Sequence, residues 1–600
     1  MVRKRSSNIS SKNCVEAGER PPAGIRSSKG ECLLLFLLSL LVLFIYSNTL
    51  DSPFIFDDKP NIQDNPQIRL SELTLDGVKK AGASSRPVAM ISFALNYYFH
   101  QYNVLGYHLV NILIHITTGI LLYLFVGITL KMPSVVAMYG AHRWIPFFTA
   151  LLWLVHPTQT QSVTYVVQRM NSMAAMFYLL SLLLYAKARL AGEKRKRWLL
   201  FVGSGLSGLL ALGSKQTAAT LPVFVLGYEW YFFQGLSKDW LKRHLAYLFG
   251  ITVFFAVISL VFLGLNPLET FQSIGDYSRN EFTFGQRVLT QFRVVIYYLS
   301  LLFYPLPSRL NLDYDFPLSL SLISPLTTLL SAGAIVGIIG LACCLARKER
   351  LISFCILWFL GNLVIESSVI PLAIIFEHRT YLPSMLVSLV AVALAYRHIN
   401  WRWGTVVTLC AMVALCSAWT FQRNSVWSND VALWSDCVRK SPSKARPHNS
   451  LGAALARQGK LDEAMRHYST ALEIDPDFAE PHCNLGTALA HQGRLDEAIS
   501  HFLKALEIKP DYAKAHNSLG TATARQGRLD EAISHFLKAL EIKPDYAKAH
   551  NNLGSAFARQ GKLDEAISHF TEALKIKPDY NRAMKNLRSA LADKAGKGGP

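Results

Sequence analysis

The chain has 600 residues, of which 51% are hydrophobic and 17% charged, and it carries a formal net charge of +20. This length and apolar content exclude a single soluble domain and predict a membrane protein with a further part attached. The basic residues gather between apolar runs, as the positive-inside pattern requires, and not in the single stripe of a nucleic-acid-binding protein, so no nucleic acid is expected as a partner.

The first apolar run of membrane length covers residues 33–50 and follows a basic segment, residues 1–32. No small-residue cleavage site follows the run, so we interpret it as a retained signal anchor behind a cytoplasmic N-terminus. It opens a polytopic membrane domain, residues 33–421. Further spans are predicted near residues 107–130, 144–155, 173–190, 198–212, 218–233, 246–265, 288–304, 322–345, 351–364, 381–396 and 404–421.

Basic clusters between these runs belong inside, and satisfying all of them requires roughly eleven true crossings, with residues 288–304 as the best candidate for a run that does not traverse. An odd number of crossings places the C-terminus outside. Five connecting segments are then expected on the same extracytoplasmic side, namely residues 51–106, 157–171, 266–286, 308–321 and 366–379.

Two adjacent acids, Asp57 and Asp58, follow the first span at the edge of the bilayer. Burial near lipid raises the pKa of a carboxyl group, and a neighbouring like charge raises it further, so one of the two is a natural proton acceptor. The alternative is a pair of solvated turn residues ahead of Pro60. Asp58 is slightly preferred as the base, but the sequence does not decide.

Three polar residues of the next predicted span, His108, Asn111 and His115, share one helix face, because they are spaced three and four residues apart. Polar groups at that depth face a bundle interior or a wet cavity, and we expect them to line the site. Simple hydrogen bonds between helices are the alternative.

Two further outer segments carry candidate site residues. His156 begins a polar turn that continues to Gln168 and Arg169, and the guanidinium of Arg169 is suited to hold a phosphate with two parallel hydrogen bonds. Arg169 is alternatively a side chain that reaches the lipid headgroups. Lys215 lies on the outer side against the positive-inside trend, as a phosphate-binding cation or an interfacial anchor.

The last outer segment reads Phe-Glu377-His378-Arg379-Thr-Tyr-Leu-Pro. Glu377 is expected to orient Arg379 or His378, which leaves Arg379 as a second candidate for phosphate binding, whereas an internal salt bridge is the alternative. The polar segments are predicted to face one side of the membrane, which favours a common polar site.

After residue 443 the character of the sequence changes to a 34-residue period, with Asn-Ser-Leu-Gly or a close variant in each unit and a closing proline. This pattern resembles the tetratricopeptide repeat and predicts four repeats over residues 444–579 that stack into an α-solenoid. Residues 422–443 are predicted to form a half repeat with a linker, and residues 580–600 a capping helix with a tail.

Recurring polar residues on the first helix of the repeats are predicted to line a groove for a protein partner. Asparagine can bond an extended peptide and arginine can bind acidic groups. Recent duplication of the repeats is the alternative explanation. The predicted groove residues are Asn449, Arg457, Asn517, Arg525, Asn551 and Arg559.

The order of these motifs resembles the family of transmembrane and tetratricopeptide-repeat proteins, which are GT-C-type glycosyltransferases related to protein O-mannosyltransferases. The resemblance covers nearly all of residues 33–593. It rests on Phe-Asp57-Asp58-Lys-Pro-Asn, Arg86-Pro87, Gly-Tyr-His108-Leu-Val-Asn111-Ile-Leu-Ile-His115, His156-Pro157, Ser214-Lys215 and Glu377-His378-Arg379-Thr-Tyr-Leu-Pro.

The resemblance implies an all-α fold, a polytopic GT-C-like helical bundle followed by the repeat solenoid. It implies a catalytic acid in the first outer loop, Arg86 in the site, and a sugar donor on a polyprenyl or dolichyl phosphate. Gln161 and Asn171 stand where animal members often carry acids. The forms His-Pro-Thr-Gln-Thr-Gln161 and Leu-Asn-Leu-Asp313-Tyr-Asp315 look more like bacterial relatives. A bacterial inner membrane with periplasmic repeats is therefore expected, or an endoplasmic reticulum membrane with luminal repeats in a eukaryote.

The expected function is transfer of a sugar, with mannose as one candidate, from the lipid phosphate to a protein hydroxyl, with the repeats recruiting the acceptor. A carboxylate would accept the hydroxyl proton and arginine would stabilise the departing phosphate. The lipid-linked sugar is a substrate, and no cofactor is predicted. Cysteine spacing implies neither a disulfide framework nor a zinc site. A non-catalytic repeat scaffold is the main alternative and a transporter the third.

Overall fold

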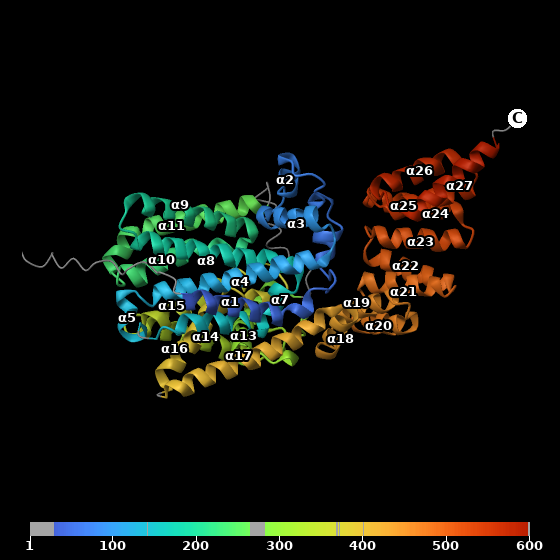
Figure 1. The fold of residues 1–600 in the computed structure, drawn as a ribbon. Helices are drawn as coiled ribbons and strands as arrows, with labels where there is room; N and C mark the ends of the chain where they lie inside the picture. The colour runs from blue at the N-terminus through green and yellow to red at the C-terminus, as the bar shows by residue number, and fades with distance from the viewer. Residues whose placement is uncertain are drawn as a thin grey trace, which may run out of the picture. The chain divides into compact units, whose positions relative to one another are not determined.

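The structure is a computed structural model that describes residues 29–140, 142–263, 282–367, 370, 372–399 and 401–597. Every regular element in these described ranges is a helix, which confirms the all-α class. The chain divides into two compact units (Figure 1). The first unit runs up to Leu310 and includes Phe316–Ser428, and the second contains Asn311–Asp315 and the chain from Asn429 onward.

The first unit begins with α1, which carries an almost continuous apolar sequence, and most of its later helices are apolar as well. Its helices are α1 (Lys29–Ile45), α2 (Leu75–Ala81), α3 (Pro87–His100), α4 (Val104–Thr129), α5 (Pro133–Tyr139), α6 (Ile145–Leu154), α7 (Thr160–Val163), α8 (Arg169–Leu190), α9 (Lys194–Ser214), α10 (Leu221–Tyr228), α11 (Lys238–Leu263), α13 (Phe284–Phe303), α14 (Thr327–Leu345), α15 (Arg350–Leu363), α16 (Ser384–His398) and α17 (Arg402–Ser425).

Six helical segments of the described residues are long and apolar enough to cross a membrane, so the chain is a multi-pass membrane protein. They are Lys29–Thr49, Val104–Thr129, Val166–Leu190, Lys194–Ser214, Thr327–Leu345 and Trp403–Ser428. The apolar helices α6, α15 and α16 are shorter, and α6 has only 10 residues, a rise of about 15 Å that is too short for a crossing by itself. The expected total of roughly eleven crossings therefore stays a prediction.

The interior of the first unit is a continuous apolar core in which α4 packs against α6 and α8, α8 against α9, and α6 against α16. Trp153, Tyr178, Trp358 and Tyr381 are fully buried in it. The segments that connect these helices at one end carry the polar residues predicted for the site. Most of the predicted outer segment 266–286 lies outside the described residues.

The second unit is built from helix pairs of the repeat. After α18 (Asp430–Lys440) come α19 (Ala445–Arg457), α20 (Leu461–Ile474), α21 (Ala479–His491), α22 (Leu495–Ile508), α23 (Ala513–Arg525), α24 (Leu529–Ile542), α25 (Ala547–Arg559), α26 (Leu563–Ile576) and α27 (Asn581–Lys597). The two helices of each pair meet closely because of a glycine. A Cβ on Gly520 would lie 2.9 Å from the carbonyl oxygen of Ala532, which leaves no room for a larger residue.

Four helix pairs, α19–α26, fill the predicted repeat region, and α27 packs on the last of them. The first unit does not end at residue 421, because α17 continues to Ser425 and is followed by a short turn of helix, Val426–Ser428. The segment Asn311–Asp315 belongs to the second unit. Its Asn311 donates to Ser441 Oγ at 2.8 Å, and Asp313 lies 3.3 Å from Lys444 Nζ and 3.6 Å from Arg446 Nη1.

Candidate active site

The carboxylate of Asp58 is buried and bonded to the backbone on both sides. Its Oδ2 accepts the N–H of Ile55 at 3.0 Å, and its Oδ1 accepts the N–H of Val167 at 2.7 Å. Burial raises the pKa of Asp58 to about 8, although the two N–H groups act in the opposite direction. Asp58 thus joins the first outer loop to the short turn Val166–Gln168 ahead of α8.

Asp57 is half-buried and is the more accessible of the two acids. Its N–H donates to the Tyr165 hydroxyl at 2.8 Å, and the Tyr165 side chain also hydrogen-bonds the Asp57 side chain. The preceding residue, Phe56, has a φ of 50°, a strained conformation for a bulky residue. The geometry therefore does not favour Asp58 as the base, because Asp58 holds the loop while Asp57 remains accessible. Sequence reasoning missed Tyr165, which has no distinguishing motif.

A buried ion pair lies where α9 ends. Lys215 Nζ is 2.6 Å from Oε1 of Glu366 and 3.2 Å from Oδ1 of Asn171. Both charged side chains are buried. Burial lowers the pKa of Lys215, and Glu366 opposes this shift. Burial would raise the pKa of Glu366, but Lys215 and Arg379 outweigh it and lower the pKa.

Two arginines are electrostatically coupled to Glu366 of this pair. Arg379 is 4% exposed, and it donates to the carbonyl oxygens of Ile374 at 3.1 Å and Ala373 at 2.7 Å. Arg86 lies at the start of α3, with Nε 3.4 Å from Gln216 Oε1, and burial lowers its pKa although Glu366 and Asp57 act to raise it. Three cations, Arg86, Lys215 and Arg379, are thus electrostatically coupled to the one carboxylate of Glu366.

His378 is held by the side chains of Gln161 and Asn171. Both its backbone N–H and its Nδ1 lie within hydrogen-bond distance of Gln161 Oε1, at 2.8 and 3.0 Å, and its carbonyl accepts Asn171 Nδ2 at 2.7 Å. Burial and the neighbouring cations Lys215, Arg379 and Arg86 keep the pKa of His378 well below its ordinary value. Neutral amides at 161 and 171 therefore fix the segment that carries Arg379.

Arg169 does not join this cationic group. It is fully buried, and its guanidinium donates to Asn111 Oδ1 at 2.7 Å and to the carbonyls of Tyr107 at 3.0 Å and Ser92 at 3.3 Å. These bonds lock α8 onto α3 and α4. The geometry thus gives Arg169 a structural role in place of the predicted contact with a phosphate.

Glu377 has a partner that sequence reasoning did not predict. Its Oε1 lies 3.8 Å from Nη2 of Arg423, and both side chains are 1% exposed. It therefore pairs with Arg423 of α17, and orientation of His378 or Arg379 by Glu377 stays a prediction. Sequence reasoning missed Arg423, because an arginine near the end of an apolar helix usually indicates an interfacial residue.

The predicted histidines of the membrane unit are buried and bonded within the fold. His108 Nε2 lies 2.8 Å from the Ser52 carbonyl oxygen, His115 Nδ1 2.8 Å from the Tyr381 hydroxyl, and His156 Nε2 3.1 Å from the Leu302 carbonyl oxygen. Burial lowers the pKa of His156 to about 4. Gln168 is half-buried at the end of the turn before α8. These residues position the loops around the acids.

The predicted groove asparagines of the repeats link one repeat to the next. The Oδ1 of Asn449 accepts Asn484 Nδ2, that of Asn517 accepts Asn552 Nδ2, and that of Asn551 accepts Asn586 Nδ2, each at 2.9 Å. Asn517 and Asn551 are buried. The Oδ1 atoms of these asparagines thus bond between repeats, and their assignment to a groove for a partner stays a prediction.

The predicted groove arginines likewise make contacts within the second unit. Arg559 donates to the Ala524 carbonyl at 2.7 Å, Arg525 donates to the Ala490 carbonyl, and Arg457 pairs with Asp430. All three nevertheless stay exposed, so contact with a partner remains open to them.

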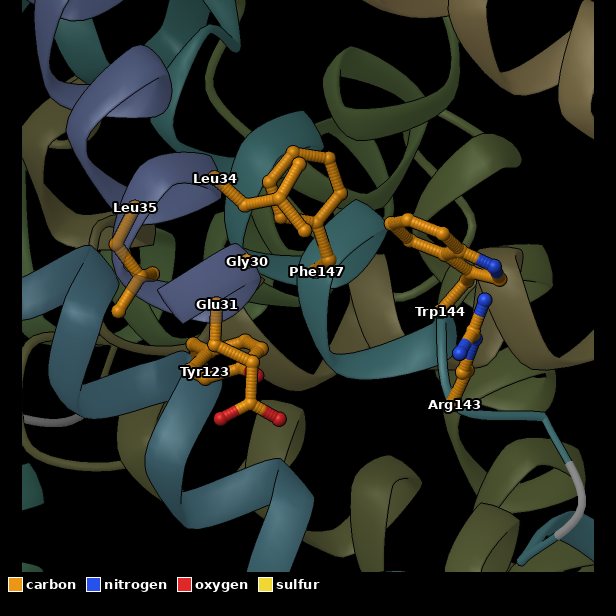
Figure 2. A pocket seen from close by; sticks show the side chains of 8 residues that line it. All are labelled: Gly30, Glu31, Leu34, Leu35, Tyr123, Arg143, Trp144 and Phe147. Atoms are coloured by element: carbon orange, nitrogen blue, oxygen red, sulfur yellow. The ribbon is translucent and has the colours of Figure 1, made fainter. Parts of the chain in front are cut away.

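Pockets in the described part of the first unit include two whose lining residues do not include Lys215 or Glu366. One, of about 360 Å³, lies at the N-terminal end of α1, opposite the end that precedes the acids, with Arg143 stacked on Trp144 at its rim (Figure 2). Its lining residues are Gly30, Glu31, Leu34, Leu35, Tyr123, Arg143, Trp144 and Phe147. The other, of about 290 Å³, is mainly apolar and lies between α6, α13, α16 and α17, with His156 and Ser384 among its lining residues.

Comparison with known families confirms the repeats. The family model described as tetratricopeptide repeat matches residues 477–545 and 511–579, and a second TPR model matches residues 452–493. Among solved structures, a thermophilic TPR protein of Thermus thermophilus is 22% identical and covers 30% of this chain and 95% of that chain, with a TM-score of 0.25.

The predicted family resemblance is also confirmed, over 76 to 77% of this chain. Protein O-mannosyl-transferase Tmtc3 of Drosophila melanogaster is 24% identical over 541 residues, with 76% of this chain and 57% of that protein covered. Protein O-mannosyl-transferase F38B6.6 of Caenorhabditis elegans is 25% identical over 480 residues, with 77% and 65% covered. This chain therefore spans only part of the length of these curated relatives.

Proposed function

We propose that this chain, which is similar to proteins named protein O-mannosyl-transferase, is a membrane glycosyltransferase that moves a sugar from a polyprenyl or dolichyl phosphate to a hydroxyl group of a protein. The observation that carries this proposal is the excess of positive charge at the buried Lys215 and Arg379 and the half-buried Arg86 around the buried carboxylate of Glu366. Burial of uncompensated charge is expensive, and a phosphate anion would compensate it.

Arg379 has an N–H group that is placed to donate a hydrogen bond to such an anion. Its Nε is buried, and it has no hydrogen-bond partner among the described residues, although Nη1 and Nη2 bond backbone carbonyls. A buried N–H without a partner is rare because it loses its hydration. A phosphate oxygen of the donor would satisfy it and would use the charge of the guanidinium at the same time.

Asp57 is our candidate for the general base. It is the more accessible acid, Tyr165 holds it, and it is electrostatically coupled to Arg86 of the cationic group. The acceptor hydroxyl would transfer its proton to Asp57 as its oxygen attacks the anomeric carbon, and the bond from that carbon to the phosphate oxygen would break. Attack from the face opposite the phosphate inverts the anomeric configuration.

The cations would stabilise the negative charge that develops on the leaving lipid phosphate. Asp58 would act as a positioning residue, because its backbone bonds fix the loop that carries Asp57. Gln161 and Asn171 would position Arg379 through His378. Mannose is the favoured sugar by the names of the relatives.

In this proposal the first unit binds the lipid-linked sugar and the repeats bind the protein acceptor. The apolar pocket between α6, α13, α16 and α17 suits a hydrocarbon chain, and His156 is one of its lining residues. Tetratricopeptide repeats support protein binding, and we propose that the array recruits the acceptor on the extracytoplasmic side, with a bacterial inner membrane favoured.

The direct test uses the full chain purified in detergent. It would be offered a polyprenyl-phosphate mannose together with an extract of extracytoplasmic proteins, and sugar transfer to protein would be followed by radiolabel. We expect Arg379→Gln to abolish sugar transfer. The control Lys242→Gln, which removes an exposed cation of α11, should retain it. Equal transfer by both variants would contradict the assigned site, and failure of the unaltered chain with every polyprenyl-phosphate sugar would contradict the function.

A further inference from the structure

Each of the four repeats contains two histidines that face each other. One lies on the first helix of the repeat and the other lies 19 residues later on the second helix. Their Nδ1 atoms are 3.2, 3.0, 3.3 and 3.1 Å apart in the pairs His448 and His467, His482 and His501, His516 and His535, and His550 and His569. The same geometry thus recurs along the array.

The first histidine of every pair is held in one tautomer. Its Nε2 lies 3.1 to 3.2 Å from a proline carbonyl oxygen, at Pro442, Pro476, Pro510 and Pro544 in turn. A carbonyl only accepts, so Nε2 must carry the hydrogen, and the lone pair is therefore on Nδ1. Metal-binding histidines are fixed in this way, by donation of the other ring N–H to a carbonyl or carboxylate.

From this geometry we propose that each repeat carries a two-histidine site for a divalent first-row transition-metal ion, bound by both Nδ1 atoms. Nitrogen ligands that lie about 2.0 to 2.1 Å from such an ion are about 2.8 to 3.4 Å apart when the angle at the metal is between about 90° and 109°. The observed separations of 3.0 to 3.3 Å lie within this interval.

Metal binding requires only small movements of the two histidine rings of a pair. Without metal, the second histidine donates its Nδ1–H to the first, and metal binding requires the second ring to move that hydrogen to Nε2. Both lone pairs must also turn from each other toward a common point, and the broad second torsion of histidine allows this. The rings of His516 and His535 are already inclined by 30° to each other.

The surroundings combine carboxylates with basic side chains and do not form a closed cage. Arg466 acts against a cation at His467, as Arg528 does at His535. The second histidines are electrostatically coupled to a carboxylate, Glu463 for His467, Glu497 for His501, Glu531 for His535 and Glu572 for His569. No group of three or more potential metal ligands occurs within the described residues, so water must complete the coordination. We therefore expect affinities below those of structural zinc sites, with Cu²⁺ bound more tightly than Ni²⁺ or Zn²⁺.

The bound ion would clamp the two helices of one repeat together. Binding to the folded state alone stabilises that state by mass action. The sites lie in the second unit, so they do not depend on the proposed transferase chemistry. Sequence reasoning predicted no metal site, because each pair is split between two helices and lacks a short ligand motif.

The test measures binding stoichiometry on the full chain in detergent after removal of metal by a chelator. Cu²⁺ would be added at increasing concentration, with equilibrium dialysis to count bound ions and electron paramagnetic resonance to detect nitrogen ligands. We expect the quadruple variant of His467, His501, His535 and His569 to glutamine to bind four fewer ions than the unaltered chain. The matched control, His491→Gln, removes an exposed histidine of α21 outside the pairs and should leave the count unchanged.

A variant with one substitution tests the proposal even if the quadruple variant does not fold. His501→Gln should bind one ion fewer, and Zn²⁺ should raise its thermal unfolding temperature less than that of the unaltered chain. The proposal is overturned if the pair variants bind as many ions as the unaltered chain. It is also overturned if His491→Gln loses as many ions as His501→Gln, since binding would then be a property of any surface histidine.

Discussion

Lys215 and Glu366 form a buried ion pair of 2.6 Å that joins the end of α9 to the segment after α15. Asn171 completes the contact from α8, at 3.2 Å from Lys215 Nζ. Segments that are far apart in the sequence are thereby brought to one point. Because two further cations act on Glu366, its removal affects the electrostatics of the whole group.

The first prediction concerns this pair. Glu366→Gln leaves Lys215 buried without its counterion and should destabilise the fold by about 3 to 5 kcal/mol, whereas the double variant Lys215→Met with Glu366→Gln should recover part of this loss. Denaturant unfolding in detergent measures both. The exposed pair of Lys504 and Glu507 serves as control, since Glu507→Gln should change stability by about 0 to 1 kcal/mol. Independent, additive losses in the double variant would argue against a coupled buried pair.

The second prediction separates the two acids. Asp57→Asn should lower sugar transfer on the order of 10²-fold or more, with the protein still inserted and able to bind donor, because only the base is lost. Asp58→Asn should reduce stability first, since an amide NH₂ would meet a backbone N–H at Ile55 or Val167. Transfer assays and thermal unfolding on the same preparations distinguish the two. Full activity in Asp57→Asn would remove it as the base.

The third prediction is the pH dependence that follows from Asp58. Its folded-state pKa of about 8 lies above the ordinary value of 3.8, so the folded state holds a proton that the unfolded chain releases. This contribution to stability is complete below about pH 4 and is lost as the pH rises through about 8. Unfolding temperatures measured from pH 5 to 9 should fall more steeply in the unaltered chain than in Asp58→Asn. Parallel curves would refute the raised pKa.

A fourth prediction compares two arginines of the first unit. Arg379→Lys keeps the charge but loses the planar group, and it should weaken donor use by roughly 1 to 3 kcal/mol, seen as a raised KM for the lipid-linked sugar. Arg169→Lys breaks the bonds to Asn111, Ser92 and Tyr107, and should lower the unfolding temperature instead. The assignment fails if Arg169→Lys impairs donor binding at unchanged stability.

The fifth prediction concerns the asparagine links between repeats. Asn517→Ala removes one acceptor of the half-buried Asn552 amide, which keeps only its 3.3 Å bond to Thr521 Oγ1, and should destabilise the array by about 0.5 to 1.5 kcal/mol. Gln458→Ala, at an exposed position after α19, should have little effect. Thermal unfolding measures both changes. An unchanged unfolding temperature in Asn517→Ala, combined with weaker binding of an acceptor protein, would assign the asparagines to a binding groove.

The regular parts of the fold could be predicted from periodicity. The repeats follow a strict 34-residue pattern, and the polar residues of α4 share the face that spacing predicts. The lengths of the short helices were harder to predict, because residues 144–155 and 218–233 are almost entirely apolar. Hydropathy alone does not reveal that α6 has only 10 residues or that the second run changes from α-helix to π-helix after Tyr228.

The partners within the candidate site could not be predicted, because they depend on which loops meet. Spacing identified Arg169 and Glu377 as charged outer residues, but their partners Asn111 and Arg423 come from other helices. Glu366 was visible in the sequence as an acid of an outer segment. Its role as the centre of three cations depends on the ends of α3 and α9, which no local pattern brings together.

The membership of Asn311–Asp315 in the second unit has a consequence for how that unit can be isolated. A single protease cut after Ser428 would not release it cleanly, since Asn311 and Asp313 still bond Ser441 and Lys444.

Residues Asn311–Asp315 also leave the ribosome well before Asn429. The second unit therefore cannot finish assembling until the chain from Asn429 onward has emerged. A truncated chain that ends at Ser443 would lose both basic partners of Asp313, and a cut inside the later repeats preserves them.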